Sequence, residues 1–257
     1  MRTRLIRTAL AAAFLALLIV ASTQAEPESA RVGDLVLTDN GGIIPRKLPR
    51  HEQVPISAVI DAHIGTVDGS HPPAIRSISI DFDKTLAVHA KGLPTCRKGQ
   101  LEARPTAAAK SACRPAIVGE GDGEVEVAFP EQAPFSATGP IILFNGGVHG
   151  GTTLLYVHAY VSVPGPTAVV ATVRLTRIHR GHFGIHADAE IPRIAGGAGS
   201  VTRFKVRIGR RFTYRGGRAS YLTGSCPTGR YYTEGKVRFE DDTRLGLTHV
   251  LPCTPEG

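Results

Sequence analysis

The stretch SISIDFD, residues 77–83, alternates apolar and polar side chains one by one. Its two isoleucines and its phenylalanine lie on one face of an extended chain, and its serines and aspartates lie on the other. This period of two is typical of a β-strand with one face in an apolar core and one in water. The apolar face resumes after a short Asp-Lys turn at residues 83–84, so residues 77–90 are predicted to form a hairpin.

The same alternation recurs through the rest of the chain. We expect further strands at residues 124–127, 141–144, 154–163, 169–178, 182–191, 201–208, 211–214, 219–223 and 236–239. The two strands at 169–191 are predicted to form a hairpin that turns at residues 180–181, and the glycine-rich residues 145–151 are expected to be a loop. The 29 glycines and 18 prolines favour turns over long helices.

These features predict an all-β protein with a β-sandwich or jelly-roll-like fold. One short helix is expected at residues 105–112, because proline is favoured in the first turn of a helix. We treat residues 26–257 as one domain, with a possible subdivision near residues 119–124, where glycines alternate with acidic residues.

The first 25 residues have the three parts of a secretory signal. Arg2, Arg4 and Arg7 give a positive start, residues 9–20 are uninterruptedly apolar, and small residues at 23–25 place cleavage before Glu26. The apolar run is shorter than the about 20 residues that a membrane-spanning helix needs. The sequence therefore predicts an exported protein without a transmembrane segment after cleavage.

The four cysteines of an exported chain are expected to form two disulfides, for which three pairings are possible. The spacing favours Cys96 with Cys113 and Cys226 with Cys253, because each pair is close in sequence. The predicted helix then lies inside the first disulfide loop. Neither pair has the C-x-x-C spacing of a structural zinc site.

Three segments resemble a pattern found in exported actinobacterial proteins of unknown activity. They are KGLPTC at residues 91–96, the alanine-rich segment that ends at Cys113, and SYL at residues 220–222 before Cys226. The resemblance implies an exported, disulfide-linked β protein and implies nothing about activity.

A second resemblance concerns the sequence DFDKT at residues 81–85, which is similar to the D-x-D-x-T motif of haloacid-dehalogenase-type phosphatases. It implies that Asp81 is a nucleophile, Asp83 an acid/base and Thr85 a positioning residue, with Mg²⁺ at the phosphate. That family also has an α/β fold, whose helices this chain lacks. A polar face of a hairpin explains the same letters, so the phosphatase is an alternative hypothesis.

A group of histidines and a carboxylate offers a second alternative, a metal site. His179, His182, His186 and Asp188 are predicted to lie on one exposed face of the hairpin at 169–191. Four strand residues separate His182 from His186, a distance of about 13 Å that is too long for one ion to bridge. A solvated polar face is therefore the favoured interpretation, and we expect no metal or other cofactor.

Basic residues are concentrated near the C-terminal third of the chain. The protein has a net charge of +8, and residues 174–218 contain eleven basic and two acidic residues. The alternation at 201–208 would place several cations on one outward face and so attract anions. The predicted binding residues are Arg203, Lys205, Arg207, Arg210, Arg211, Arg215 and Arg218.

From the sequence we therefore expect an exported, non-catalytic binding or cell-envelope protein. Its expected partner is an anionic cell-wall polymer, a lipid headgroup or an acidic glycan. Few aromatic residues alternate with the cations, which argues against specific nucleic-acid binding. The alternative is an exported metal-dependent hydrolase or phosphatase.

Overall fold

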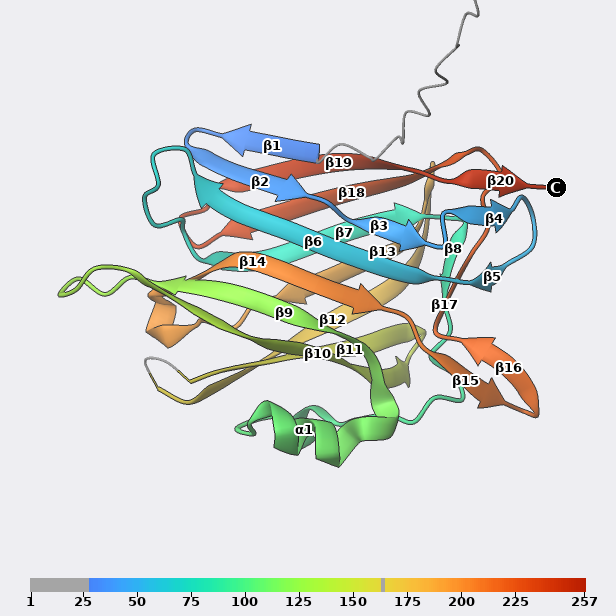
Figure 1. Ribbon diagram of the computed structural model, residues 1–257, viewed down its shortest axis with the longest axis horizontal. Helices are drawn as coiled ribbons and strands as arrows, with labels where there is room; N and C mark the ends of the chain where they lie inside the picture. The colour runs from blue at the N-terminus through green and yellow to red at the C-terminus, as the bar shows by residue number, and fades with distance from the viewer. Residues whose placement is uncertain (1–27, 163–164) are drawn as a thin grey trace, which may run out of the picture.

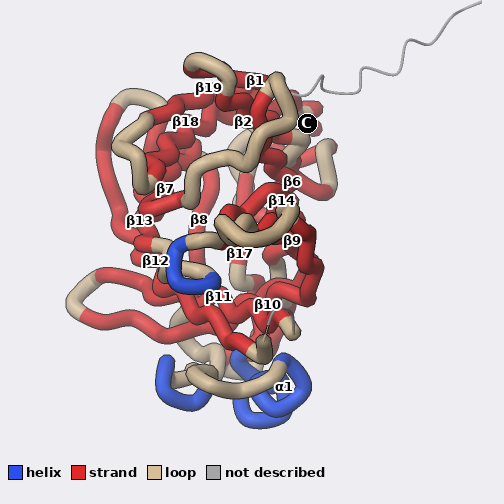
Figure 2. Tube along the Cα trace, turned by 90° about the vertical axis from the view of Figure 1, so that its left-hand side faces the viewer, coloured by secondary structure: helices blue, strands red, loops and turns tan. Residues whose placement is uncertain are grey.

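The computed structural model describes residues 28–162 and 165–257, and most of these residues belong to β-strands. One large sheet curls until its first and last strands lie beside each other, as Figure 1 shows from the side and Figure 2 from one end. The prediction of an all-β fold with one short helix is confirmed. The predicted signal segment lies outside the described residues.

The strands of the first half of the chain are β1 (Glu28–Val32), β2 (Leu35–Asp39), β3 (Gly42–Ile44), β4 (Lys47–Pro49), β5 (Val54–Pro55), β6 (Ser57–Thr66), β7 (Ile75–Asp83), β8 (Leu86–Val88) and β9 (Ile117–Val127). Those that follow are β10 (Phe135–His149), β11 (Thr152–Val161), β12 (Thr167–Arg180), β13 (Phe183–Glu190), β14 (Gly199–Ile208), β15 (Arg211–Tyr214), β16 (Gly217–Ser220), β17 (Leu222–Gly224), β18 (Arg230–Phe239), β19 (Arg244–Pro252) and β20 (Thr254–Glu256). The helix α1 spans Thr106–Cys113, and 3₁₀ turns lie at Lys98–Gln100, Arg114–Ala116 and Ala195–Gly197.

The large sheet is antiparallel, and its strand order is β1-β2-β6-β14-β9-β10-β11-β12-β13-β7-β18-β19, with β3 also paired to β6. The edge strands β1 and β19 lie side by side, but no strand ladder joins them within the described residues. Three small sheets, β15-β16, β5-β17-β8 and β4-β20, lie outside it. We call the large sheet the curled sheet.

Alternating side chains of the curled sheet fill its interior. Ile141 and Leu143 of β10, Leu155 of β11 and Val206 of β14 are buried together there. Because alternate side chains of a strand point to opposite faces, every strand of the ring contributes to this interior. Apolar burial on the inward face is therefore the main stabilising force of the fold.

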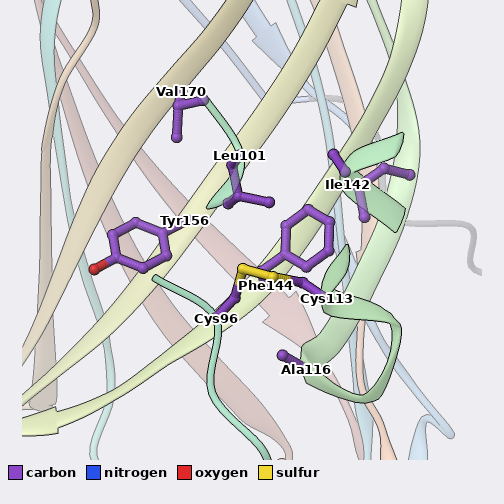
Figure 3. Close-up of a cluster of buried hydrophobic side chains, with 9 residues drawn as sticks. Cys96, Leu101, Cys113, Ala116, Ile142, Phe144, Tyr156 and Val170 are labelled. Atoms are coloured by element: carbon purple, nitrogen blue, oxygen red, sulfur yellow. A yellow bond between two sulfur atoms is a disulfide. The ribbon is translucent and has the colours of Figure 1, made fainter. Parts of the chain in front are cut away.

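A second apolar cluster lies on the outer face of the curled sheet, where Figure 1 shows α1 beneath β10 and β11, and Figure 3 shows its side chains. Leu101 packs there with Phe144, Tyr156 and the disulfide between Cys96 and Cys113. The helix α1 belongs to this cap, since Ala109 and Cys113 are its buried residues. Both predicted disulfides, Cys96–Cys113 and Cys226–Cys253, are confirmed.

The cap explains why one loop prediction is wrong. Residues 145–149 continue β10 as a strand, and only the two glycines at 150–151 turn the chain. The buried Asn145 accepts a backbone hydrogen bond from Cys96 (2.8 Å), and its side-chain amide donates to the carbonyl of Pro94 (3.1 Å). The cap segment thus satisfies polar groups that a loop would have exposed to water.

Two hairpin predictions also differ from the structure. The predicted hairpin at 77–90 is wrong, because β7 pairs with β13 and β18 while β8 pairs with β17. The hairpin at 169–191 forms, but it turns at residues 181–182, one residue later than expected, and Arg180 pairs with Phe183. Alternation indicates which residues are in strands but does not specify their partners.

The glycine-rich residues 119–124 lie in the centre of the sheet, where β9 runs between β14 and β10. A Cβ atom on Gly121 would overlap the backbone carbonyl oxygen of Lys205 on β14. The chain can approach so closely only because this residue has no side chain. The glycines that suggested a domain boundary therefore serve the contact between β9 and β14.

We expect Gly121→Ala to lower the free energy of unfolding by about 3 kcal/mol, because the added methyl group must push two paired strands apart. Denaturant unfolding followed by circular dichroism measures the change. Gly42→Ala in β3 is the matched control, since a Cβ there meets nothing within 4 Å. Equal stability of the two variants would contradict the close approach.

A buried histidine makes the fold sensitive to acid. His158 on β11 is fully buried, and burial lowers its pKa, while a hydrogen bond from Nε2 to the carbonyl of Arg104 (2.9 Å) opposes the shift. Since the unfolded chain takes up this proton near pH 6.5, before the folded chain does, stability is full above that pH and decreases as the pH falls below it.

We expect the unfolding midpoint to decrease between pH 7.5 and pH 5, and to decrease less in His158→Gln, which has no group to protonate. We compare how steeply the unfolding midpoint changes with pH in the wild type and in His158→Gln, so the contributions of other titrating groups cancel. Identical slopes would show that His158 contributes nothing to the acid sensitivity.

Candidate functional site: a cationic cleft

Among the described residues, one surface depression has a volume of about 1160 Å³. It is lined by residues from the adjoining ends of β12 and β13, from β8 and from the β15-β16 hairpin. No aspartate or glutamate of residues 28–162 and 165–257 lines it, and its basic lining residues are Lys84, His89, Lys91, Arg177, His179, Arg180 and Arg218. We call this depression the cationic cleft.

The cations of the cleft differ in how far they are already neutralised. Arg180 forms ion pairs with Asp81 and Glu234, and Lys84 donates to the carbonyl of Gly181 (3.3 Å). Lys91, Arg177 and Arg218 are exposed and have no ion-pair partner in the part of the chain that the structure describes. These three side chains are therefore free to receive an anion. We call them the unpaired cations.

A chain of neutral polar groups lies beside the unpaired cations. Thr223 donates to the side-chain oxygen of Gln53 (2.8 Å), so its hydroxyl accepts the Nε2 proton of His89 (2.9 Å). Burial, together with the nearby charge of Arg177, lowers the pKa of His89. His89 is therefore a neutral hydrogen-bonding group at neutral pH, and lysine and arginine supply the charge of the cleft.

Aromatic rings complete the wall on the β15-β16 side. Phe212 and Tyr214 both line the cleft. The guanidinium of Arg215 lies 5.3 Å from the centre of the Tyr214 ring, a cation–π distance. The cleft thus combines positive charge, hydrogen-bonding side chains and flat apolar surfaces.

The three predicted binding residues of β14 face carboxylates across the sheet. Arg203, Lys205 and Arg207 stand opposite the acidic side chains of residues 120–124 in β9. Lys205 also forms an ion pair with Asp61 of β6 (2.9 Å). The positive charge predicted for this strand is therefore matched by neighbours that are distant in sequence.

The other four predicted binding residues are divided. Arg210 donates to the carbonyl of Ile117 (2.7 Å), Arg215 covers Tyr214, and Arg211 is exposed on β15. Only Arg218 lines the cationic cleft. The seven predicted residues therefore differ in their surroundings, and the sequence did not single out Lys84, Lys91 and Arg177, which line the cleft.

The two aspartates of the phosphatase-like motif hold the fold together. Asp81 is buried, and its carboxylate accepts from Arg180 and from Nδ1 of His186 (2.6 Å). Asp83 accepts from the backbone and hydroxyl of Thr85 (2.9 and 2.8 Å) and from the backbone of Tyr232 (3.0 Å). Within the described residues no serine, threonine or cysteine side chain is hydrogen-bonded to the imidazole of His186, and Thr176 donates only to its backbone carbonyl (3.4 Å).

The predicted metal-ligand set is dispersed. His179 lines the cleft, whereas His182 lies in the turn and stacks on Tyr232 with ring centres 4.2 Å apart. His186 contacts Asp81, and Asp188 pairs with Arg174 (3.5 Å). Across residues 28–162 and 165–257, no three histidine, cysteine or acidic side chains are arranged to hold a metal ion.

Fold and cleft together define a disulfide-linked, all-β protein with a cationic surface depression. No family model, no curated protein and no solved structure matches this chain. No helix among the described residues has the length and apolar character needed to cross a membrane.

We expect Asp81→Asn to lower the free energy of unfolding by about 1 to 3 kcal/mol. The substitution removes a buried carboxylate that is hydrogen-bonded to Arg180 and His186. The matched control is Asp188→Asn, whose exposed ion pair with Arg174 should contribute less than about 1 kcal/mol. Denaturant titration of both variants measures the two changes in the free energy of unfolding. A stable Asp81→Asn protein would show that this carboxylate is not structural.

Proposed function

We propose that the protein binds an acidic polysaccharide outside the cytoplasm, without catalysis, through the cationic cleft. The observation that supports the proposal is a cleft lined by five lysines and arginines and, within the described part of the chain, by no carboxylate. Such a site concentrates anions electrostatically, and guanidinium groups bind carboxylates or sulfates through paired hydrogen bonds.

The neutral groups of the cleft favour a sugar polymer over a simple ion. The donors of Gln53 and Thr223 are engaged within the protein, so their oxygens offer acceptor lone pairs to the hydroxyl groups of a sugar. Tyr214 presents an amphipathic ring. An acidic polysaccharide carries all three complementary features along one chain.

An extracytoplasmic location is supported by the two disulfides, which persist in oxidising compartments. We propose further that the chain is exported by its N-terminal signal and cleaved before Glu26. N-terminal sequencing of the protein recovered from outside the expressing cells is expected to begin at Glu26. Recovery of an intact Met1 N-terminus would contradict this assignment.

The cleft is tested with the double variant Arg177→Glu/Arg218→Glu. We expect its affinity for polygalacturonate to be at least about tenfold lower than that of the wild type, because two charge-assisted contacts become repulsive. The matched control is Arg203→Glu/Arg207→Glu on β14, which changes the net charge equally but lies outside the cleft. Affinity is measured by titration calorimetry at low salt and again at 1 M salt.

We expect the wild type and the β14 variant to bind polygalacturonate at low salt. We expect the cleft variant to lose this binding, and all binding to disappear at 1 M salt. Neutral dextran should not bind. Loss of binding in the β14 variant alone would move the site to β14. A wild-type protein that binds anionic lipid vesicles but no acidic polysaccharide would overturn the proposal.

A further inference from the structure

The interior of the curled sheet is not completely filled. An apolar cavity of about 310 Å³ lies inside the curled sheet, among its inward-facing side chains. In a barrel of eight strands the side chains can just fill the interior. The curled sheet has twelve strands in its order, so its interior is wider. Small inward residues leave further space: Ala159, Ala171, Ala187 and Ala189, together with Gly235 of β18, line the cavity.

One end of this cavity is polar. His249 of β19 and Asp39 of β2 line it, and Nδ1 of His249 lies 3.0 Å from the carboxylate of Asp39. The backbone of Gly41 donates to the other oxygen of that carboxylate (2.9 Å), which fixes its orientation. The pair thus connects β19, the last strand of the sheet order, with β2, which is next to the first.

The other ring nitrogen of His249 has no partner. Only 4% of this side chain is exposed, and its Nε2 atom is buried without a hydrogen bond. Buried polar atoms are nearly always satisfied, so an unsatisfied one beside a cavity indicates a missing group. Thr233 stands directly opposite His249 on β18 and also lines the cavity.

We propose that the cavity binds one small aliphatic alcohol, with its chain in the apolar interior and its hydroxyl group on Nε2 of His249. When Nδ1 donates its proton to Asp39, Nε2 of the neutral ring is an acceptor, and a hydroxyl donor matches it. The volume is about twice that of an engineered apolar cavity of about 150 Å³ that binds benzene. The ligand therefore has about ten to twelve carbon atoms.

The first experiment measures the binding of straight-chain alcohols from hexan-1-ol to hexadecan-1-ol to the full protein by equilibrium dialysis. Each added methylene is expected to tighten binding about fourfold, until the chain fills the cavity near ten to twelve carbons. Longer alcohols should gain nothing more. No binding of octan-1-ol or decan-1-ol, or affinity that rises without limit up to sixteen carbons, would overturn the proposal.

Two variants locate the ligand. Gly235→Leu should weaken decan-1-ol binding at least about tenfold by filling the cavity, and a Cβ at this position meets only a carbonyl oxygen at 3.9 Å. His249→Leu should abolish the preference for octan-1-ol over octane, about a tenfold change, because the acceptor is lost. Thr233→Val provides a second test of the polar end if His249→Leu does not fold.

Gly33→Ala, in the turn between β1 and β2, is the control outside the cavity, and it should bind decan-1-ol like the wild type. Circular dichroism confirms that each variant is folded before it is used. Unchanged binding of decan-1-ol in folded Gly235→Leu would overturn the proposal. Polygalacturonate binding should be normal in Gly235→Leu, which separates the cavity from the cationic cleft.

Discussion

The inward alternation of apolar side chains around one continuous sheet is the constraint on which the rest of the structure depends. Twelve strands share this inward face, and their curl brings β1 beside β19. The outward face is then free to carry charge on β14 and β9, a disulfide-linked cap on β10 and the cationic cleft at one end. A change of one residue in the register of any strand would exchange its apolar and polar faces and break this division.

Sequence periodicity was sufficient for the fold class and for most strands after residue 77, and the spacing of the cysteines favoured the two disulfides that form, but the strands β1 to β6 were not predicted. It could not supply strand partners, because β7 alternates in the same way whether it pairs with β8 or with β13 and β18. It also misjudged residues 145–149, where glycine and asparagine are typical of loops. Their backbone remains a strand because the cap segment at residues 93–96 buries it from outside.

The sites were harder to predict than the strands, because they are assembled from distant segments. Counting charges along residues 174–218 detected a real excess, but the carboxylates that neutralise β14 belong to β9 and β6. The unpaired cations come from three separate segments, and only Arg218 had been singled out. Asp39 and His249 are 210 residues apart, so no local pattern could have indicated that they share one hydrogen bond.

The disulfide between Cys96 and Cys113 determines what happens when a protease cuts the backbone of the cap. Arg97 and Lys98 are exposed within the loop that Cys96 and Cys113 close. A protease that cuts after either residue leaves two fragments, but the sulfur–sulfur bond still joins them. Leu101 and Phe144 can then remain packed together, so the nicked molecule survives as a single particle until a reductant separates its parts.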